Sequence, residues 1–132
     1  SPQLSWKNVP KGTKSFALII DDQDAKDDQR DWIHWSVMNI NKNVTSIAAN
    51  TTPDGVLVEL NSNRSRSYAD PAFPKNHTYV AHVYALDIED ISKVEQANRD
   101  KIYYPNSQYD HKTFEKIFAN FILEKSRIVS QR

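Results

Sequence analysis

The hydrophobic and polar positions in the N-terminal and central parts of the chain predict β-strands. The segment from Ser15 to Asp21 contains a continuous apolar run of strand length, which is typical of a central strand covered on both faces. Trp32 to Ile40 is rich in aromatic and β-branched residues and predicts another strand. Thr78 to Asp87 gives the clearest strand signal, because its apolar side chains would contact both faces. Shorter strands are expected at residues 4–6 and 56–60.

The period of the pattern changes in the C-terminal third, where it predicts helices. Apolar residues recur at the i, i+3, i+4, i+7 and i+8 spacing of an amphipathic helix, and they are Phe114, Ile117, Phe118, Phe121 and Ile122. Asp110 is placed to cap this helix. Ser92 and Glu95 have capping-box spacing ahead of a shorter helical stretch that reaches about Asn98. Arg127 to Ser130 predicts a last strand.

These elements predict a mainly β fold. Strands come first and helices follow, which favours an antiparallel sheet or β-sandwich with one or two C-terminal helices. Between the first two long strands, residues 22–31 are dense in charge, so we expect a solvated loop there. The chain has 132 residues and no internal repeat or linker, so we expect one domain, residues 1–132.

Charge and composition narrow the class of protein. Lys plus Arg and Asp plus Glu both number 17, so no global field would attract nucleic acid or anionic lipid. The sequence has 0 Cys, which excludes disulfides, thiolate metal sites and a cysteine nucleophile and fits a reducing compartment. No run approaches the roughly 18 apolar residues of a membrane span. We therefore expect a soluble, cytoplasmic protein without a transmembrane segment.

Three separated stretches each place two site-type side chains one residue apart. The pairs are Asp22 and Asp24, Trp32 and His34, and His77 and Tyr79. In an extended chain, residues i and i+2 point to the same face, so each pair would present its two groups together. Ile33 and Trp35 would then face the other way. If the three stretches meet, they form a pocket that is more polar than a folded core requires.

Each pair also has an ordinary structural explanation. Acids are common where a strand ends in a turn, a buried histidine can be satisfied by a backbone carbonyl, and a loop can simply enter a strand. His82 and His111 lack comparable neighbours in the sequence, and we interpret both as structural or surface residues.

The side chains of such a pocket favour a small anion. Two imidazoles and a phenol can donate several hydrogen bonds to phosphate oxygens, and an indole supplies an apolar wall. Carboxylates repel a phosphate unless they orient a histidine, accept from a protonated phosphate or face a cationic group. A zwitterionic ligand would satisfy both kinds of side chain.

At these residues the chain resembles the phosphatidylethanolamine-binding protein family, also called Raf kinase inhibitor-like proteins, in its short bacterial and archaeal branch. The opening, residues 1–18, resembles the start of the family. Residues 22–26 resemble its Asp-Pro-Asp-Ala-Pro motif, residues 32–35 its Trp-x-His motif, and residues 68–79 its Tyr-x-Gly-Pro…Pro…His-x-Tyr segment. The ordered agreement covers residues 1–87 and, more faintly, the C-terminal helix.

The resemblance implies a sandwich of a large and a small antiparallel sheet with an anion-binding pocket at one end. Its ligand-binding positions fall on Asp22, Asp24, Trp32, His34, Pro71, His77 and Tyr79. We expect a non-enzymatic protein, without a cofactor or metal, that binds a phospholipid head group such as phosphoethanolamine, or another phosphorylated ligand. It would regulate a kinase or another protein partner. The family's first strands precede Ser1, so we expect the sandwich to lack them.

The chain departs from the family's motifs near the expected pocket. Gln23 and Lys26 replace prolines, so a cis bond there would cost about 2.5–4 kcal/mol as a non-proline cis peptide. Asp70 replaces a glycine and adds a third acid near the mouth, while Lys26 adds a cation. Thr78 stands where many members carry arginine. These changes would weaken or redirect phosphate binding.

Two other functions remain open at the level of the sequence. Asp22, His34 and His77 form a two-histidine, one-carboxylate set that could hold a catalytic zinc in a metal-dependent hydrolase. The polar loop from Asn61 to Ser67 could act as the surface loop of a protease inhibitor.

Overall fold

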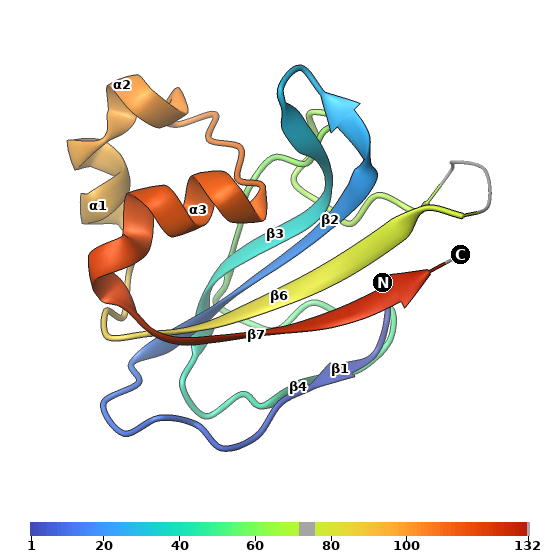
Figure 1. Cartoon of the computed structure of the whole chain (residues 1–132). Coiled ribbons are helices and arrows are strands. Elements are labelled where there is room, and N and C mark those ends of the chain that lie inside the picture. The colour runs from blue at the N-terminus through green and yellow to red at the C-terminus, as the bar shows by residue number, and fades with distance from the viewer. Residues whose placement is uncertain (72–75, 132) are drawn as a thin grey trace.

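An antiparallel sheet of five strands forms the centre of the computed structural model, which describes residues 1–71 and 76–131 (Figure 1). Its strand order is β5-β3-β2-β6-β7, and a second sheet pairs β1 with β4. The strands are β1 Leu4–Ser5, β2 Ser15–Asp27, β3 Arg30–Asn41, β4 Ser46–Ile47, β5 Leu57–Val58, β6 Thr78–Leu86 and β7 Ile122–Gln131. The predicted mainly β fold, with a large and a small antiparallel sheet, is confirmed.

Strand β2 lies in the middle of the large sheet and is buried on both faces, as its apolar run predicted. Alternate side chains enter two separate cores. The first core lies towards the small sheet and includes Phe16, Leu18, Ile20, Trp35, Ala81 and Val83. The second core lies under the helices and includes Ala17, Ile19, Tyr84, Tyr109, Phe114 and Phe118. The fold is therefore three layers deep, with β2 in the middle layer.

Short helices in the described part of the chain cover the second core. They are α1 Ser92–Ala97, α2 Arg99–Ile102 and α3 His111–Phe118, followed by the 3₁₀ turn η1 Ala119–Phe121. Figure 1 shows the helices on one side of the large sheet and β1 and β4 on the other. Asp110 caps α3 as predicted, since its carboxylate accepts from the Thr113 N–H at 2.9 Å. None of these helices has the length and apolar composition that a membrane span needs.

The C-terminal apolar stripe was wrongly extended into one long helix. Helix α3 ends at Phe118, η1 follows, and Ile122 already begins β7, before the predicted last strand. Phe114 and Phe118 are buried, whereas Ile117, Phe121 and Ile122 are half-buried and pack against the same core. The helical spacing continues past the helix because η1 and the first residue of β7 must also cover that core.

The charged segment 22–31 is a β-hairpin and not the loop that we predicted. Strands β2 and β3 continue through it to Asp27 and Arg30, and Asp28 occupies the turn with φ 61. Lys26 is the Cα partner of Asp31, and the two side chains form an ion pair across the hairpin. Polar residues suit both faces here because this arm extends beyond the two hydrophobic cores.

The predicted capping box at the start of α1 is also wrong. Ile91 is the N-cap residue and α1 has no side-chain cap, while the Asp90 carboxylate accepts from both the N–H and the hydroxyl of Ser92. Glu95 is buried instead and accepts from the Tyr109 hydroxyl at 2.9 Å. A second buried carboxyl, Glu59, is hydrogen-bonded to it. Burial, together with the charge of Glu95, raises the pKa of Glu59 to about 8.

The cap of α3 should matter for stability. Asp110→Ala removes the acceptor of Thr113 and leaves the buried N–H of Asp31, which donates to Asp110 at 3.1 Å, without a partner. We expect the free energy of unfolding to fall by about 2 kcal/mol, measured by urea denaturation. Asp110→Asn retains one carbonyl oxygen and should lose less. An alanine variant that unfolds at the wild-type urea concentration would contradict this role.

The buried carboxyl pair should make stability depend on pH. The pKa of Glu59 is raised from 4.5 to about 8 in the folded protein, so the unfolded chain gives up this proton first. Its contribution is complete below about pH 4.5 and is lost as the pH rises towards 8. We expect the urea midpoint to fall over this range in the wild type and to fall less in Glu59→Gln. Glu89→Gln, at an exposed position, should retain the wild-type slope, and equal slopes in all three proteins would argue against the pair.

Candidate functional site

The three residue pairs meet at one end of the large sheet, where β2, β3 and β6 lie side by side. Asp22 is the Cα partner of both Trp32 in β3 and Tyr79 in β6. Directly opposite residues of an antiparallel pair point to the same face of the sheet. Ile20 and Ala81, two residues further along β2 and β6, belong to the first core. The site therefore lies on the small-sheet side, at the edge of that core.

Asp22 holds the segment that enters β6. Its side chain is 0% exposed, and one oxygen accepts from Nδ1 of His77 at 2.6 Å. The other oxygen accepts from the Asp24 N–H at 2.9 Å, and Asp24 in turn accepts from the Thr78 N–H at 2.6 Å. Because a carboxylate only accepts, Nδ1 of His77 carries the proton. The two acids therefore fix the position and orientation of the His77 ring, which keeps 20% of its side chain exposed.

His34 is buried beside this pair. Its Nδ1 donates to the Ala69 carbonyl at 2.8 Å, and its ring lies 5.3 Å from that of Tyr79 and 6.5 Å from that of Tyr68. Burial lowers the pKa of His34, although the Ala69 carbonyl and the Asp22 charge oppose this effect. The neutral ring then has an unprotonated Nε2. This buried atom has no hydrogen-bond partner among the described residues.

The remaining predicted positions surround these two histidines. Tyr79 is buried, and its ring lies 6.4 Å from His77. Trp32 is half-buried next to Asp22 in the register. Pro71 lines a cavity of about 320 Å³ together with Tyr68 and Tyr79. The rest of the predicted rim, residues 72–75, lies outside the described part of the chain.

The alternation that we predicted for Trp32 to Trp35 is only partly correct. Ile20 pairs with Trp35, but the next residue, Asp21, pairs with Ile33. His34 is therefore the extra residue of a β-bulge. As a result Trp35 returns to the small-sheet side, where its ring lies 5.8 Å from Tyr68, a ring that His34 also contacts. Sequence alternation cannot reveal where a strand carries one extra residue.

At the positions that depart from the family motifs the acidic hairpin is irregular, because its register shifts between Asp22 and Lys26. Among the described residues the only cis peptide bond is Tyr104–Pro105, so the bonds before Gln23 and Lys26 are trans. Lys26 points to Asp31 and is neutralised there. Asp70 is exposed, and its charge opposes the lowering of the His34 pKa by burial.

Asp22 and His77 are in contact, but the proposed zinc ligands Asp22, His34 and His77 do not form a three-ligand cluster. Among the described residues, the only cluster of three or more His, Asp or Glu ligand atoms within 4.8 Å of one another is Asp21, His82 and His111. Sequence reasoning missed this cluster, because His82 and His111 were interpreted separately. A signal existed, since His82 interrupts the most apolar strand at a position that faces inward.

The loop from Asn61 to Ser67 is anchored at its base. The Asn61 side chain accepts from Asn63 and Ser65 N–H groups and donates to the Ser67 carbonyl at 2.8 Å. Arg64 pairs with Asp27 at 3.0 Å across the neighbouring hairpin. The exposed part is therefore short and braced against the rest of the fold.

Comparisons with known proteins give a consistent result. The family model described as phosphatidylethanolamine-binding protein matches residues 1–129. A UPF0098 protein of Methanothermobacter thermautotrophicus is 39% identical over 93 residues, which cover 66% of this chain and 60% of the relative. The UPF0098 protein YbhB of Escherichia coli is 37% identical over 106 residues, which cover 74% and 66%. The chain thus spans less than two thirds of these relatives, and neither name states an enzymatic activity.

Solved structures share the fold. The crystal structure of Escherichia coli YbcL, described as a new member of the mammalian PEBP family, has a TM-score of 0.74 and 27% identity and covers 98% of this chain and 77% of its own. A phosphatidylethanolamine-binding protein homologue of Chlamydia trachomatis has a TM-score of 0.76 at 24% identity, covering 100% and 80%. With the match over residues 1–129, these findings show that the chain belongs to the phosphatidylethanolamine-binding protein family.

Proposed function

We propose that this protein binds a small phosphate-bearing ligand, without chemical conversion, at the site formed by Asp22, His34, His77 and Tyr79. Around these residues, Asp24 supports the hairpin, Trp32 forms a wall of the site and Pro71 lies at its rim. We further propose that occupancy of the site regulates a protein partner such as a kinase, in the reducing cytoplasm that the cysteine-free composition favours.

The observation that carries the proposal is the buried Nε2 of His34, which has no hydrogen-bond partner among the described residues. A buried polar atom without a partner is rare in native proteins and calls for a ligand or another explanation. Because Nδ1 donates to Ala69, Nε2 of the neutral ring accepts. A phosphomonoester has its second pKa at about 6, so a minority of it still carries a P–OH group at neutral pH, and this share grows as the pH falls. That hydroxyl can donate to Nε2 or transfer its proton to the ring.

This tautomer favours monoesters and inorganic phosphate over diesters. A phosphodiester head group has no P–OH, so it would bind only the protonated ring of His34. Burial opposes that protonation. We therefore place phosphoethanolamine and inorganic phosphate ahead of an intact phospholipid as ligands.

The acids of the site support a ligand that also carries a cationic group. Asp22 is fully occupied by His77 and Asp24, but Asp24 and Asp70 are exposed beside them. An ammonium group placed near these two carboxylates would offset their repulsion of the phosphate. The family description names phosphatidylethanolamine, a lipid whose head group combines phosphate and ammonium.

His34→Gln should weaken phosphate binding by about tenfold or more, because it removes one hydrogen bond to a charged group. Calorimetry with phosphate, phosphoethanolamine and acetate measures this loss, and acetate should bind the wild type more weakly than the other two. His111→Gln is the matched control, since His111 lies on the helix side of the sheet. Tyr79→Phe provides a second variant that preserves the buried ring.

Two results would overturn the proposal. One is a His34→Gln protein that is folded by circular dichroism and binds phosphate as tightly as the wild type. The other is a wild-type protein that gives negligible heats with all three anions.

Binding should strengthen as the pH falls. The pKa of His34 is lowered by burial in the free protein, whereas a bound anion favours the protonated ring. The complex therefore holds more protons than the separate partners, and affinity rises by at most about tenfold per pH unit for one proton. Calorimetry in buffers of different ionisation enthalpy measures the proton uptake. Uptake should be smaller in His34→Gln, and equal uptake by both proteins would exclude His34 as its source.

A further inference from the structure

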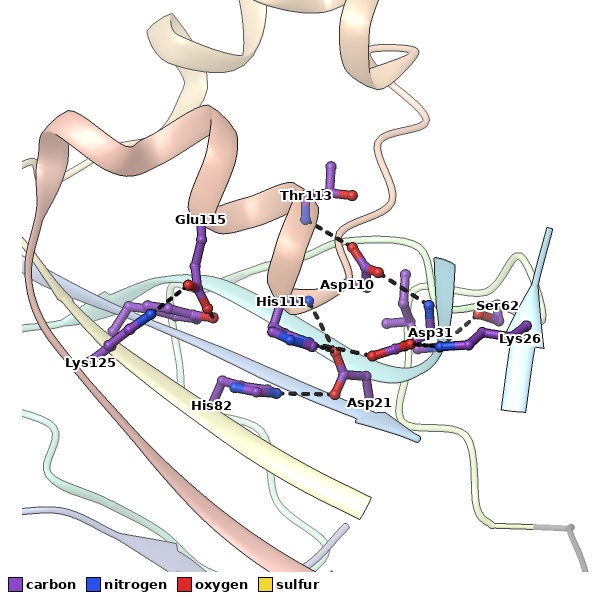
Figure 2. Close-up of polar contacts among 12 residues, drawn as sticks. Asp21, Lys26, Asp31, Ser62, His82, Asp110, His111, Thr113, Glu115 and Lys125 are labelled. Atoms are coloured by element: carbon purple, nitrogen blue, oxygen red, sulfur yellow. Dashed lines mark hydrogen bonds and ion pairs between the residues drawn. The ribbon is translucent and has the colours of Figure 1, made fainter. Parts of the chain in front are cut away.

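A second polar cluster lies on the other side of the large sheet, under α3. The Asp21 carboxylate is 0% exposed and lies between two imidazoles (Figure 2). One oxygen accepts from Nε2 of His82 at 3.1 Å, and the other accepts from Nδ1 of His111 at 2.7 Å. The proposed anion site does not use any of these three side chains.

The fold brings these residues together from three distant parts of the chain. Asp21 is the neighbour of Asp22 in β2, so it points to the opposite face. His82 pairs with Ile19 in the register, which makes it a diagonal neighbour of Asp21 on the same face. His111 is the first residue of α3, and its backbone N–H also donates to Asp21 at 3.0 Å. Asp21 therefore ties β2, β6 and α3 to one another.

The surroundings of the cluster are rich in buried negative charge. Three aspartates, Asp21, Asp31 and Asp110, are each at most 2% exposed. Of these, Asp31 forms an ion pair with the Lys26 ammonium group. Asp31 also lies 3.5 Å from Nδ1 of His111. A buried carboxylate is costly unless a cation compensates it. Positive charge is therefore strongly favoured at the two imidazoles.

The ionisation of these groups agrees with the charge balance. Burial would raise the pKa of Asp21, but hydrogen bonds from His111 and His82 outweigh it and lower the pKa to about 2. The hydrogen bond to Asp21 raises the pKa of His111, against the opposing effect of burial. In the metal-free protein, Nε2 of His82 and Nδ1 of His111 each carry the proton of their hydrogen bond to Asp21.

We propose that Asp21, His82 and His111 form a binding site for a divalent transition metal such as Zn²⁺, which replaces those protons. Two imidazole nitrogens and one carboxylate oxygen are a common zinc donor set. The three ligand atoms lie within 4.8 Å of one another. A tetrahedral Zn²⁺ holds its ligand atoms about 3.3 Å apart, given bonds of about 2.0–2.2 Å. To reach that geometry the ligand atoms must close in from separations of up to 4.8 Å.

The fourth coordination position would face an adjoining cavity. This cavity has a volume of about 400 Å³ and is lined by His82, His111, Glu115, Lys125, Ser126 and Arg127. Glu115 is engaged by Lys125 at 2.7 Å and by the Tyr84 hydroxyl at 2.8 Å (Figure 2). Water from the cavity would therefore complete the coordination.

Metal binding must compete with the metal-free arrangement. The His82 and His111 rings are stacked with centroids 4.2 Å apart and an interplanar angle of 11°. A metal lies close to the plane of each imidazole that binds it, so the rings must tilt away from parallel. The metal must also displace protons, so its affinity should rise with pH between about pH 6 and pH 8. The bound ion would cross-link the sheet and α3 and raise the melting temperature.

The test is metal titration of chelator-treated protein in phosphate-free buffer. We expect Zn²⁺ calorimetry to show one site, and Co²⁺ to give the visible absorption of a tetrahedral complex. His82→Gln and His111→Gln should each weaken binding at least tenfold and abolish the rise in melting temperature with Zn²⁺. His77→Gln is the matched control, because His77 also donates to a buried aspartate but has no second imidazole on that aspartate. It should bind Zn²⁺ like the wild type.

Three outcomes would overturn the site. They are no uptake of Zn²⁺ or Co²⁺ by the wild type across this pH range, unchanged binding in both cluster variants, and loss of binding in His77→Gln alone. If a cluster variant fails to fold, the histidine ring resonances of the wild type decide the question. Zn²⁺ must then shift those of His82 and His111 far more than that of His34.

Discussion

The alternation of β2 between two layers is the constraint on which the rest of the structure depends. Asp21 and Asp22 are adjacent in sequence and both are fully buried, yet they point to opposite faces of the sheet. Asp22 reaches His77 on the small-sheet side, and Asp21 reaches His82 and His111 under the helices. One strand end thus places a buried carboxylate in each half of the molecule. The fold must supply partners for both.

The two carboxylates meet this requirement in different ways. Asp22 shares its oxygens between an imidazole and the backbone of its own hairpin, which leaves a partly exposed histidine at the edge of the sheet. Asp21 gives both oxygens to imidazoles and also receives the first N–H of α3, so it joins sheet and helix. The first arrangement fixes the orientation of a ring at the proposed anion site. The second holds the large sheet and α3 together, and an ion bound at the proposed metal site would add a further link between these two layers.

The sequence was informative for several features that depend on local spacing. The apolar run of β2, the cap at Asp110 and the i, i+2 pairs at residues 22, 32 and 77 follow from spacing alone, and the structure brings those pairs to one end of the sheet. Three features depend on how strands and helices pair in space and could not be predicted. They are the bulge at His34, which only the register with β2 reveals, the hairpin arm, whose charges pair across strands, and the Asp21–His111 contact, which joins residues 90 positions apart.

The two clusters are separated by the sheet but are not electrically independent. Burial lowers the pKa of His34, and the charges of Asp22 and Asp21 oppose that shift, although the Asp21 side chain lies on the far face. A divalent ion on Asp21 would cancel that contribution and make protonation of His34 harder. The same ion would attract an anion through the sheet and so offset part of the affinity lost in this way. Metal occupancy should therefore reduce the number of protons taken up on anion binding more than it reduces the affinity for the anion.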